Sequence, residues 1–258
     1  MRQFFLDVSD DQTIAVGETV TLDRDESHHL ATVLRGGRES ELRLVDGRGN
    51  RFTGEAAGKD GKCALVKITS AQVDPEEHRR PGLVLSCAVV KGKRFEWALE
   101  KAVELGAHTI VPLLCDHGVI EPREGKQSRW LAMMKSAVKQ CGRSWLPKLA
   151  SPQTLAGVLA SRNECVHFYG VAPYELPADE VPFWRTLLDT PAEDPPGELN
   201  FLVGPEGGWS SAELSQLEKN ATAVSLGPHI LRAETAAAAG LTALQAVRQA
   251  WSSPASDN

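Results

Sequence analysis

Residues 204–210 read Gly-Pro-Glu-Gly-Gly-Trp-Ser, and they directly follow an apolar run, 199–203, that predicts a buried strand. A second stretch, Leu-Gly-Pro-His-Ile-Leu-Arg at 226–232, follows a similar run at 221–226. A helical pattern comes after each stretch. Loops that leave the carboxyl ends of strands bind ligands in open α/β sheets, and glycine and proline favour backbone shaped around a small molecule. The two loops therefore predict a ligand site, although ordinary tight turns have the same composition.

The surrounding sequence, residues 75–258, has the pattern of an α/β domain. A continuous apolar run of strand length predicts a buried strand at 83–90, and further strands are predicted at 109–114 and 166–170. Amphipathic stretches predict helices at 93–105, 130–141 and 234–251, the first ending at Gly106 and the second capped by Ser128. Ser210 and Glu213 have the spacing of a capping box for the helix that follows the first loop.

Residues 1–74 have a different pattern, with short alternating segments typical of strands at 19–22, 41–45, 51–56 and 63–68. Turn signals separate these segments, and one helical piece at 28–35 interrupts them. A compact β-barrel is the predicted structure. The polar segment 74–81 serves as the linker to the second domain.

Charge is distributed unevenly along the chain of 258 residues, whose net charge is −6. The segment 81–148 carries 11 basic and 6 acidic side chains, a balance suited to phosphates or to a solvated helix surface. The five cysteines form no C-x-x-C pair, which predicts free thiols in a reducing cytoplasm and no metal site. Because no apolar run approaches membrane-spanning length, no membrane partner is expected.

Familiar nucleotide and hydrolase motifs are missing from the two loops. Neither loop has the Lys-Ser or Lys-Thr of a P-loop, and no G-x-G-x-x-G follows the first strand of the second domain. The sequence also lacks H-E-x-x-H and G-x-S-x-G. What remains is a site of backbone groups and apolar side chains, suited to an adenosine-like ligand.

Several motifs in order resemble those of the SPOUT-class 16S ribosomal RNA uridine-N3 methyltransferases, over nearly the full length. They are Glu26-Ser27-His28-His29-Leu30, Lys91-Gly92-Lys93-Arg94-Phe95-Glu96-Trp97, Arg129-Trp130, both glycine loops and Glu234-Thr235-Ala236. The chain departs from the family pattern at Trp209, His229 and Ala233, where Phe, Arg and Thr are more usual.

The resemblance implies a fold and a cofactor. The second domain is expected to be a deep trefoil knot of the α/β class, and the first a PUA-like barrel that helps to dock 16S rRNA of the small ribosomal subunit. Members of this family are usually homodimers and hold S-adenosylmethionine largely through main-chain groups. Carried over to this sequence, the cofactor-binding residues are Phe168, Tyr169, Gly170, Val203, Gly204, Pro205, Glu206, Gly207, Leu226, Gly227, Ile230 and Leu231.

Methylation of uridine N3 requires removal of the imide proton, so a base or a cation near the cofactor loop is expected. We assign the cation to Arg232 and a base or hydrogen-bonding role to Glu234. The alternative is structural: Glu234 favours the N-terminus of the last helix and Arg232 pairs with it. Glu206 has two interpretations as well, contact near the methyl donor or a hydrogen bond within its own turn.

The predicted RNA-binding residues are Arg35, Lys91, Lys93, Arg94, Gln140 and Arg143. Solvated helix ends are the alternative for most of them. Two other functions remain open at this stage. One is a SPOUT enzyme that acts on tRNA or on another rRNA base, and the other is an inactive RNA-binding module.

Overall fold

The computed structural model describes residues 3–9, 12–35, 41–75, 81–118, 125–175 and 196–252. The chain divides into two compact units. Residues 1–77 and 135–146 form the first unit, and residues 78–134 and 147–258 form the second. Each unit is described by itself below.

The first unit is built on a five-stranded sheet in the order β1-β3-β4-β5-β2. The strands are β1 (Gln3–Phe5), β2 (Thr19–Thr21), β3 (Leu42–Val45), β4 (Asn50–Asp60) and β5 (Cys63–Val73). Only β1 pairs in parallel, with β3. The one helix of residues 1–77 that the structure describes, α1 (Arg24–Arg35), starts earlier than predicted. It starts there because Asp23 caps it, the Asp23 carboxylate accepting the Glu26 N–H at 2.7 Å.

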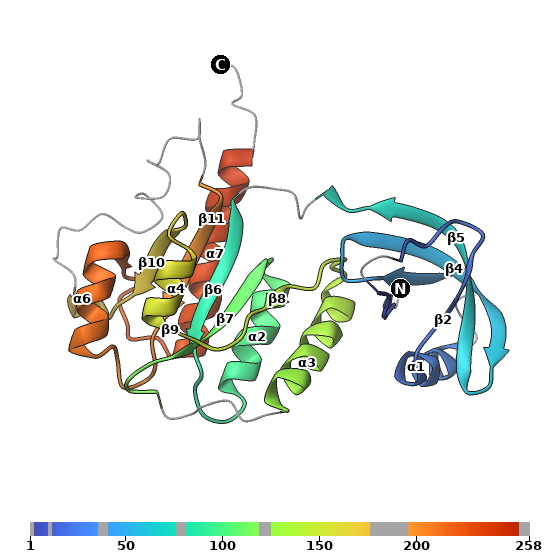
Figure 1. Ribbon diagram of the computed structural model, residues 1–258, viewed down its shortest axis with the longest axis horizontal. Coiled ribbons are helices and arrows are strands. Elements are labelled where there is room, and N and C mark those ends of the chain that lie inside the picture. The colour runs from blue at the N-terminus through green and yellow to red at the C-terminus, as the bar shows by residue number, and fades with distance from the viewer. Residues whose placement is uncertain are drawn as a thin grey trace, which may run out of the picture. The chain divides into compact units, whose positions relative to one another are not determined.

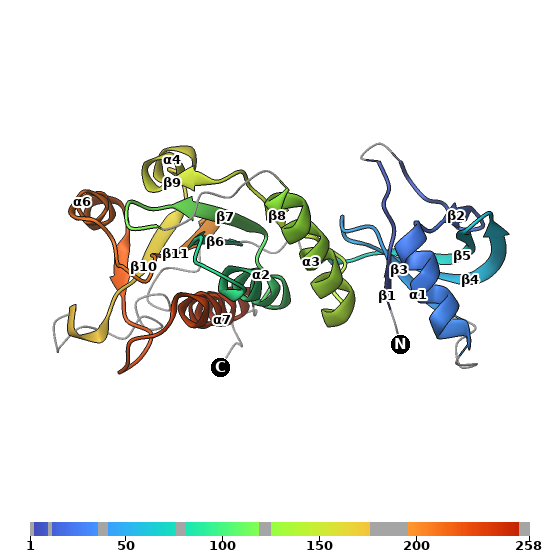
Figure 2. The same ribbon diagram turned by 90° about the horizontal axis from the view of Figure 1, so that it is seen from below.

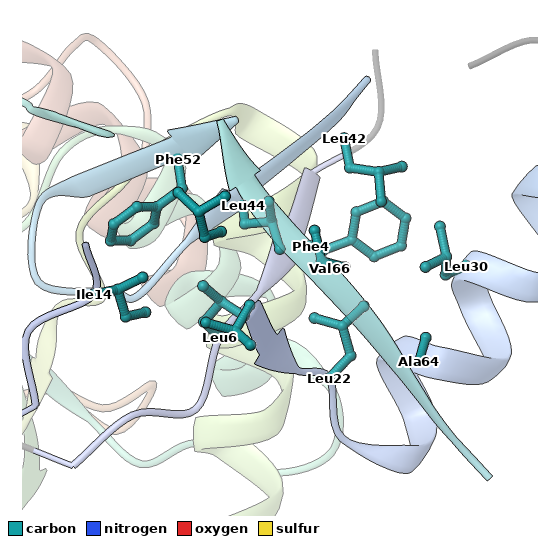
Figure 3. Close-up of a cluster of buried hydrophobic side chains, with 12 residues drawn as sticks. Phe4, Leu6, Ile14, Leu22, Leu30, Leu42, Leu44, Phe52, Ala64 and Val66 are labelled. Atoms are coloured by element: carbon teal, nitrogen blue, oxygen red, sulfur yellow. The ribbon is translucent and has the colours of Figure 1, made fainter. Parts of the chain in front are cut away.

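Alternation of side chains along these strands fills the core of the first unit. Leu42 and Leu44 are buried while Arg43 between them is exposed, as expected for a sheet with one apolar face. Figure 3 shows these leucines gathered with Phe4, Val66 and other apolar side chains of the strands and of α1. The strands predicted for this unit and a shared apolar core are present.

Residues 135–146 group with the first unit, a placement that the sequence analysis did not foresee. They comprise the second half of α3 (Lys126–Cys141) and the segment after it. Ser144 donates its hydroxyl to the Asp74 carboxylate at 2.6 Å, and the Leu146 N–H donates to the Gly47 carbonyl at 2.9 Å. The domain boundary between residues 74 and 75 stays a prediction.

The second unit is built on a seven-stranded parallel sheet in the order β12-β10-β11-β6-β7-β8, with β9 also on β7. Its strands are β6 (Gly82–Ala88), β7 (Thr109–Leu114), β8 (Lys148–Leu149), β9 (Gln153–Thr154), β10 (Val166–Gly170), β11 (Glu198–Val203) and β12 (Thr222–Val224). Helices cover both faces (Figures 1 and 2): α4 (Leu155–Ser161) and α6 (Ser211–Asn220) on one, and α2 (Arg94–Glu104) and α7 (Ala233–Ser252) on the other.

The strand order makes the chain double back across its own sheet. After β11, in the middle of the sheet, the chain goes to β12 at the edge beyond β10. It then returns as α7, which packs on β11, β6 and α2. Because all the strands are parallel, the carboxyl ends of β10, β11 and β12 lie side by side at the same end of the sheet.

Two predicted caps have different outcomes. The capping box of Ser210 and Glu213 is confirmed, since each side chain accepts the other's backbone N–H. The N-cap at Ser128 is wrong, because α3 already begins at Lys126 and Ser128 lies within its first turn.

A buried polar chain crosses the middle of the second unit's sheet. Ser86 donates its hydroxyl to the Asn200 side-chain oxygen, and the Asn200 amide donates to Nδ1 of His167, both at 3.0 Å. Nε2 of His167 then donates to the Arg162 carbonyl at 3.0 Å. These two hydrogen bonds require the neutral imidazole, because Nδ1 accepts a hydrogen bond and only Nε2 carries a proton. Burial lowers the pKa of His167 from its ordinary value of 6.5.

Stability is therefore expected to fall as the pH drops. The folded state disfavours the charged ring, so the unfolded state binds the extra proton first as the pH falls through about 6.5, and stability is lost from there downward. Denaturant unfolding of the protein and of His167→Gln at pH 7.5 and 5.5 measures this. We expect the variant to lose less free energy of unfolding between the two pH values. An equal loss in both proteins would contradict the assignment.

Candidate functional site

The two glycine loops meet around one cleft of about 640 Å³ at the carboxyl edge of the second unit's sheet. They meet there because β10 pairs with both β11 and β12, so the chain segments that leave these three strands are neighbours. The ligand loops predicted from the sequence thus share one cavity, of the size typical of small-molecule sites.

Most of the predicted cofactor residues line this cleft: Gly170, Val203, Gly204, Pro205, Glu206, Gly207, Leu226, Ile230 and Leu231. Phe168, Tyr169 and Gly227 are not among the lining residues. Phe168 and Tyr169 point into the core instead, since both are buried within β10.

Sequence reasoning missed part of the wall that follows β10. Val171, Ala172, Tyr174 and Glu175 also line the cleft. Their position could have indicated a role in the site, because they follow the carboxyl end of β10 as residue 204 follows β11. They contain no glycine motif, however. Trp209 and His229, two positions where the chain departs from the family pattern, line the cleft as well.

The segment after β7 holds the first glycine loop in place. The Asp116 backbone N–H donates to the Glu213 carboxylate at 3.1 Å, and Ser210 donates its hydroxyl to the Asp116 carboxylate at 2.5 Å. Nδ1 of His117 lies 3.2 Å from the carbonyl oxygen of Gly207. The loop is thus held at Gly207 and Ser210 before any ligand binds, which lowers the ordering cost of binding.

Close packing also limits residue 204 to glycine. A Cβ there would lie 2.8 Å from Cε2 of Trp209. The backbone of the loop and the indole ring therefore lie in direct contact along the wall of the cleft.

Glu206 pairs with Arg94, the first residue of α2. This contact differs from both interpretations made from the sequence, and no sequence signal indicated it, since the two residues are far apart in the chain. Both side chains are about half exposed, so the pair adds little to stability. Its consequence is geometric: the cofactor loop is tied to the N-terminus of α2.

Arg232 lines the cleft with an exposed side chain, directly before α7. Glu234 lies in the first turn of α7 and does not line the cleft. The structure records no ion pair between these two described residues, so the pairing alternative finds no support. One oxygen of Glu234, Oε2, is buried and has no hydrogen-bond partner within the described part of the chain. Burial, and next the charge of Glu234, raise the pKa of the Cys87 thiol to about 12.

The predicted RNA-binding residues fall into separate places. Lys91, Lys93 and Arg94 are exposed at the start of α2 in the second unit. Gln140 is exposed and Arg143 half-buried, and both belong to the first unit. Arg35 ends α1, and its side chain lies outside the described structure.

Neither a metal cluster nor a membrane-spanning helix is found in the described ranges. No group of three or more His, Cys, Asp or Glu side chains there is arranged to hold a metal ion. No described helix is long and apolar enough to cross a membrane.

Comparisons with known proteins place the chain in a family. The family model described as RNA methyltransferase domain matches residues 77–245, and that described as RNA methyltransferase PUA domain matches residues 22–69. Ribosomal RNA small subunit methyltransferase E of Mycobacterium bovis is 32% identical over 265 residues, covering 98% of this chain and 95% of the relative. The Bacillus subtilis protein of the same name is 27% identical, with coverages of 95% and 96%.

A solved structure of a protein of the same name also matches this chain. Ribosomal RNA small subunit methyltransferase E of Neisseria gonorrhoeae, bound to S-adenosylmethionine, superposes with a TM-score of 0.78 at 28% identity, covering 96% of this chain and 98% of that one. The predicted fold class is confirmed as an α/β RNA methyltransferase domain with an amino-terminal PUA-like domain. The chain belongs to the family of RNA methyltransferases that carry a PUA domain.

Proposed function

We propose that this protein transfers a methyl group from S-adenosylmethionine to N3 of a specific uridine in 16S rRNA. The observation that carries the proposal is the single cleft formed by both glycine loops, in a chain of this family. The relatives named above align with this chain over nearly the full length of both proteins, and one of them was crystallised with this cofactor bound.

The cleft fits such a cofactor in size and in chemistry. Its volume of about 640 Å³ is many times that of one water molecule and is typical of small-molecule sites. The wall offers apolar side chains, Val203, Leu226 and Leu231, for an adenosyl group, and glycine backbone for close hydrogen bonds. Glu175 supplies a carboxylate for an ammonium group. When bound, S-adenosylmethionine supplies the electrophilic methyl group.

Arg232 and Glu234 supply the remaining chemistry in this proposal. Loss of the uridine imide proton leaves a negative charge spread over the ring, and the Arg232 guanidinium at the cleft stabilises it. Glu234 does not line the cleft, so its proposed role is indirect: its buried carboxylate oxygen, which lacks a hydrogen-bond partner in the described structure, accepts a hydrogen bond from a group that relays the proton. The cleft holds the base in line with the methyl group.

The proposal includes the cellular setting. The protein acts in the cytoplasm as a homodimer on the small ribosomal subunit, where its PUA-like domain and the exposed cations Lys91 and Lys93 bind rRNA. The basic segment 81–148 supports this, because its 11 basic and 6 acidic side chains suit a phosphate backbone.

Methyl transfer to unmodified subunits tests the function. The protein is incubated with methyl-labelled S-adenosylmethionine and small subunits that lack rRNA modification, and the labelled nucleoside is mapped. We expect one labelled uridine, methylated at N3. Label on another base, or label of tRNA supplied in a parallel reaction, would overturn the substrate assignment. Failure of the folded protein to bind the cofactor in calorimetry would overturn the enzymatic assignment altogether.

A further inference from the structure

A second cleft opens in the same unit, at the end of β6. It measures about 320 Å³, and its lining residues include Val89, Val90, Lys93, Lys126 and Arg129. Phe95 and Trp130 form its floor, buried and packed together with ring centroids 4.7 Å apart. The cleft therefore has an apolar wall and floor beneath a basic rim. Of its lining residues, the proposed function uses only Lys93, as an rRNA contact.

The rim of this second cleft carries an excess of positive charge. Three cations, Lys93, Lys126 and Arg129, face one carboxylate, Glu96. Arg129 pairs with Glu96 at 2.9 Å. Lys93 and Lys126 have no ion-pair partner in the described parts of the chain. Two cations are thus left for a ligand.

Stability of the protein does not explain these cations. Lys93 caps α2 and Lys126 begins α3, at helix ends where the macrodipole disfavours positive charge. The N-cap of α2 also makes no side-chain hydrogen bond to the first turn. A local choice that opposes stability indicates a function, and here it favours an anionic ligand.

The second cleft lies beside the cofactor cleft. The strands that lead to the two clefts, β6 and β11, are paired in parallel, with Cys87 opposite Val203 near their carboxyl ends. The ion pair between Arg94 and Glu206 spans the space between the clefts, because Arg94 follows Lys93 of the second cleft and Glu206 lines the first. An RNA chain whose target base reaches the methyl donor in the cofactor cleft therefore brings its neighbouring nucleotide to the second cleft.

We propose that the second cleft binds a nucleotide of the RNA that adjoins the methylated uridine. Its phosphate lies at Lys93 and Lys126, beside the Arg129–Glu96 pair, and its sugar and base lie over the apolar wall at Val89 and Val90. The inference rests on the proposed function and adds a site that fixes which nucleotide of the RNA reaches the methyl donor. Cationic rims position the RNA backbone without reading sequence.

The salt dependence of RNA binding tests this site. Affinity for unmodified small subunits is measured between 0.05 and 0.3 M salt, roughly the range over which phosphate contacts weaken, for the protein, Lys93→Gln and Lys126→Gln. Each lost phosphate contact is expected to reduce the slope of log affinity against log salt by about 0.7 and the affinity by about fourfold at physiological salt. Cofactor affinity is expected to stay unchanged.

Two further variants make the test specific to charge in this cleft. Lys219→Gln removes an exposed cation from the end of α6, on the other face of the sheet, and is expected to leave the slope unchanged. Glu96→Gln releases Arg129 and is expected to raise RNA affinity. An unchanged slope in Lys126→Gln, or an equal loss in Lys219→Gln, would overturn the proposed site.

Failure of this site is distinguishable from failure of the proposed function. If the unaltered protein methylates uridine N3 while Lys126→Gln binds RNA normally, only the second cleft is misassigned. If the unaltered protein methylates no uridine but Lys126→Gln still weakens RNA binding with a reduced slope, the cleft is supported and the reaction is not.

Discussion

Replacement of Arg232 by alanine is expected to lower the single-turnover rate of methyl transfer about a hundredfold, at the lower end of the effect of removing one charge-stabilising donor. The side chain lines the cofactor cleft, is exposed to it, and is not engaged in an ion pair with Glu234. Its cation is therefore available to the uridine anion. Cofactor affinity, measured by calorimetry, is expected to change little, because glycine backbone and apolar side chains form most of the wall.

The pH profile separates a catalytic role of Arg232 from a structural one. A cation beside the imide favours its ionised form, so without Arg232 the rate should rise only at higher pH, and the deficit should shrink as the pH increases. Arg232→Lys keeps the charge and is expected to restore part of the rate. A hundredfold loss that is equal at all pH values, or an unchanged rate in Arg232→Ala with folding intact, would remove Arg232 from the chemistry.

The sequence predicted the middle of the second unit well, because its signals are local. A strand covered on both faces is mostly apolar, as at 199–203, where Asn200 is the one polar residue, and the structure has β11 at Glu198–Val203. The loops follow these strands and carry their own glycine and proline signals. That the loops share one cleft follows from the pairing of β10 with β11 and β12, which no local pattern contains.

What the sequence did not predict depends on contacts distant in the chain. β8 and β9 have two residues each, too few for any periodicity to register. Residues 135–146 group with the first unit because partners such as Asp74 and Gly47 lie there, although the helix pattern of α3 runs on without a break. Likewise, the pairing of Arg94 with Glu206 joins two elements that are unrelated in sequence.

A methyl group added at Gly240 is expected to destabilise the second unit by about 2 kcal/mol. Gly240 lies within α7 where that helix packs on β11, and a Cβ there would lie 2.6 Å from Cζ of Phe201. Phe201 is fully buried, so its ring has no free space into which to move. Alanine favours a helix over glycine by about 1 kcal/mol, and overpacking of this degree costs more than that gain. Denaturant unfolding measures the difference.

The same substitution tests how the fold supports the cleft, because β11 leads directly into residue 204 of the first glycine loop. Phe201→Leu replaces the ring that obstructs the new methyl group by a smaller side chain. The double variant should therefore be more stable than the sum of the two single effects predicts. Ala246→Gly, at an exposed position of α7, is the matched control and should cost only the helix-propensity difference of about 1 kcal/mol. If the effects of Gly240→Ala and Phe201→Leu are additive, the crowding does not arise at this contact. If the two effects couple, the double variant should regain both the stability and the cofactor affinity that Gly240→Ala loses. The strand that carries the ligand loop then packs on α7 without the clash.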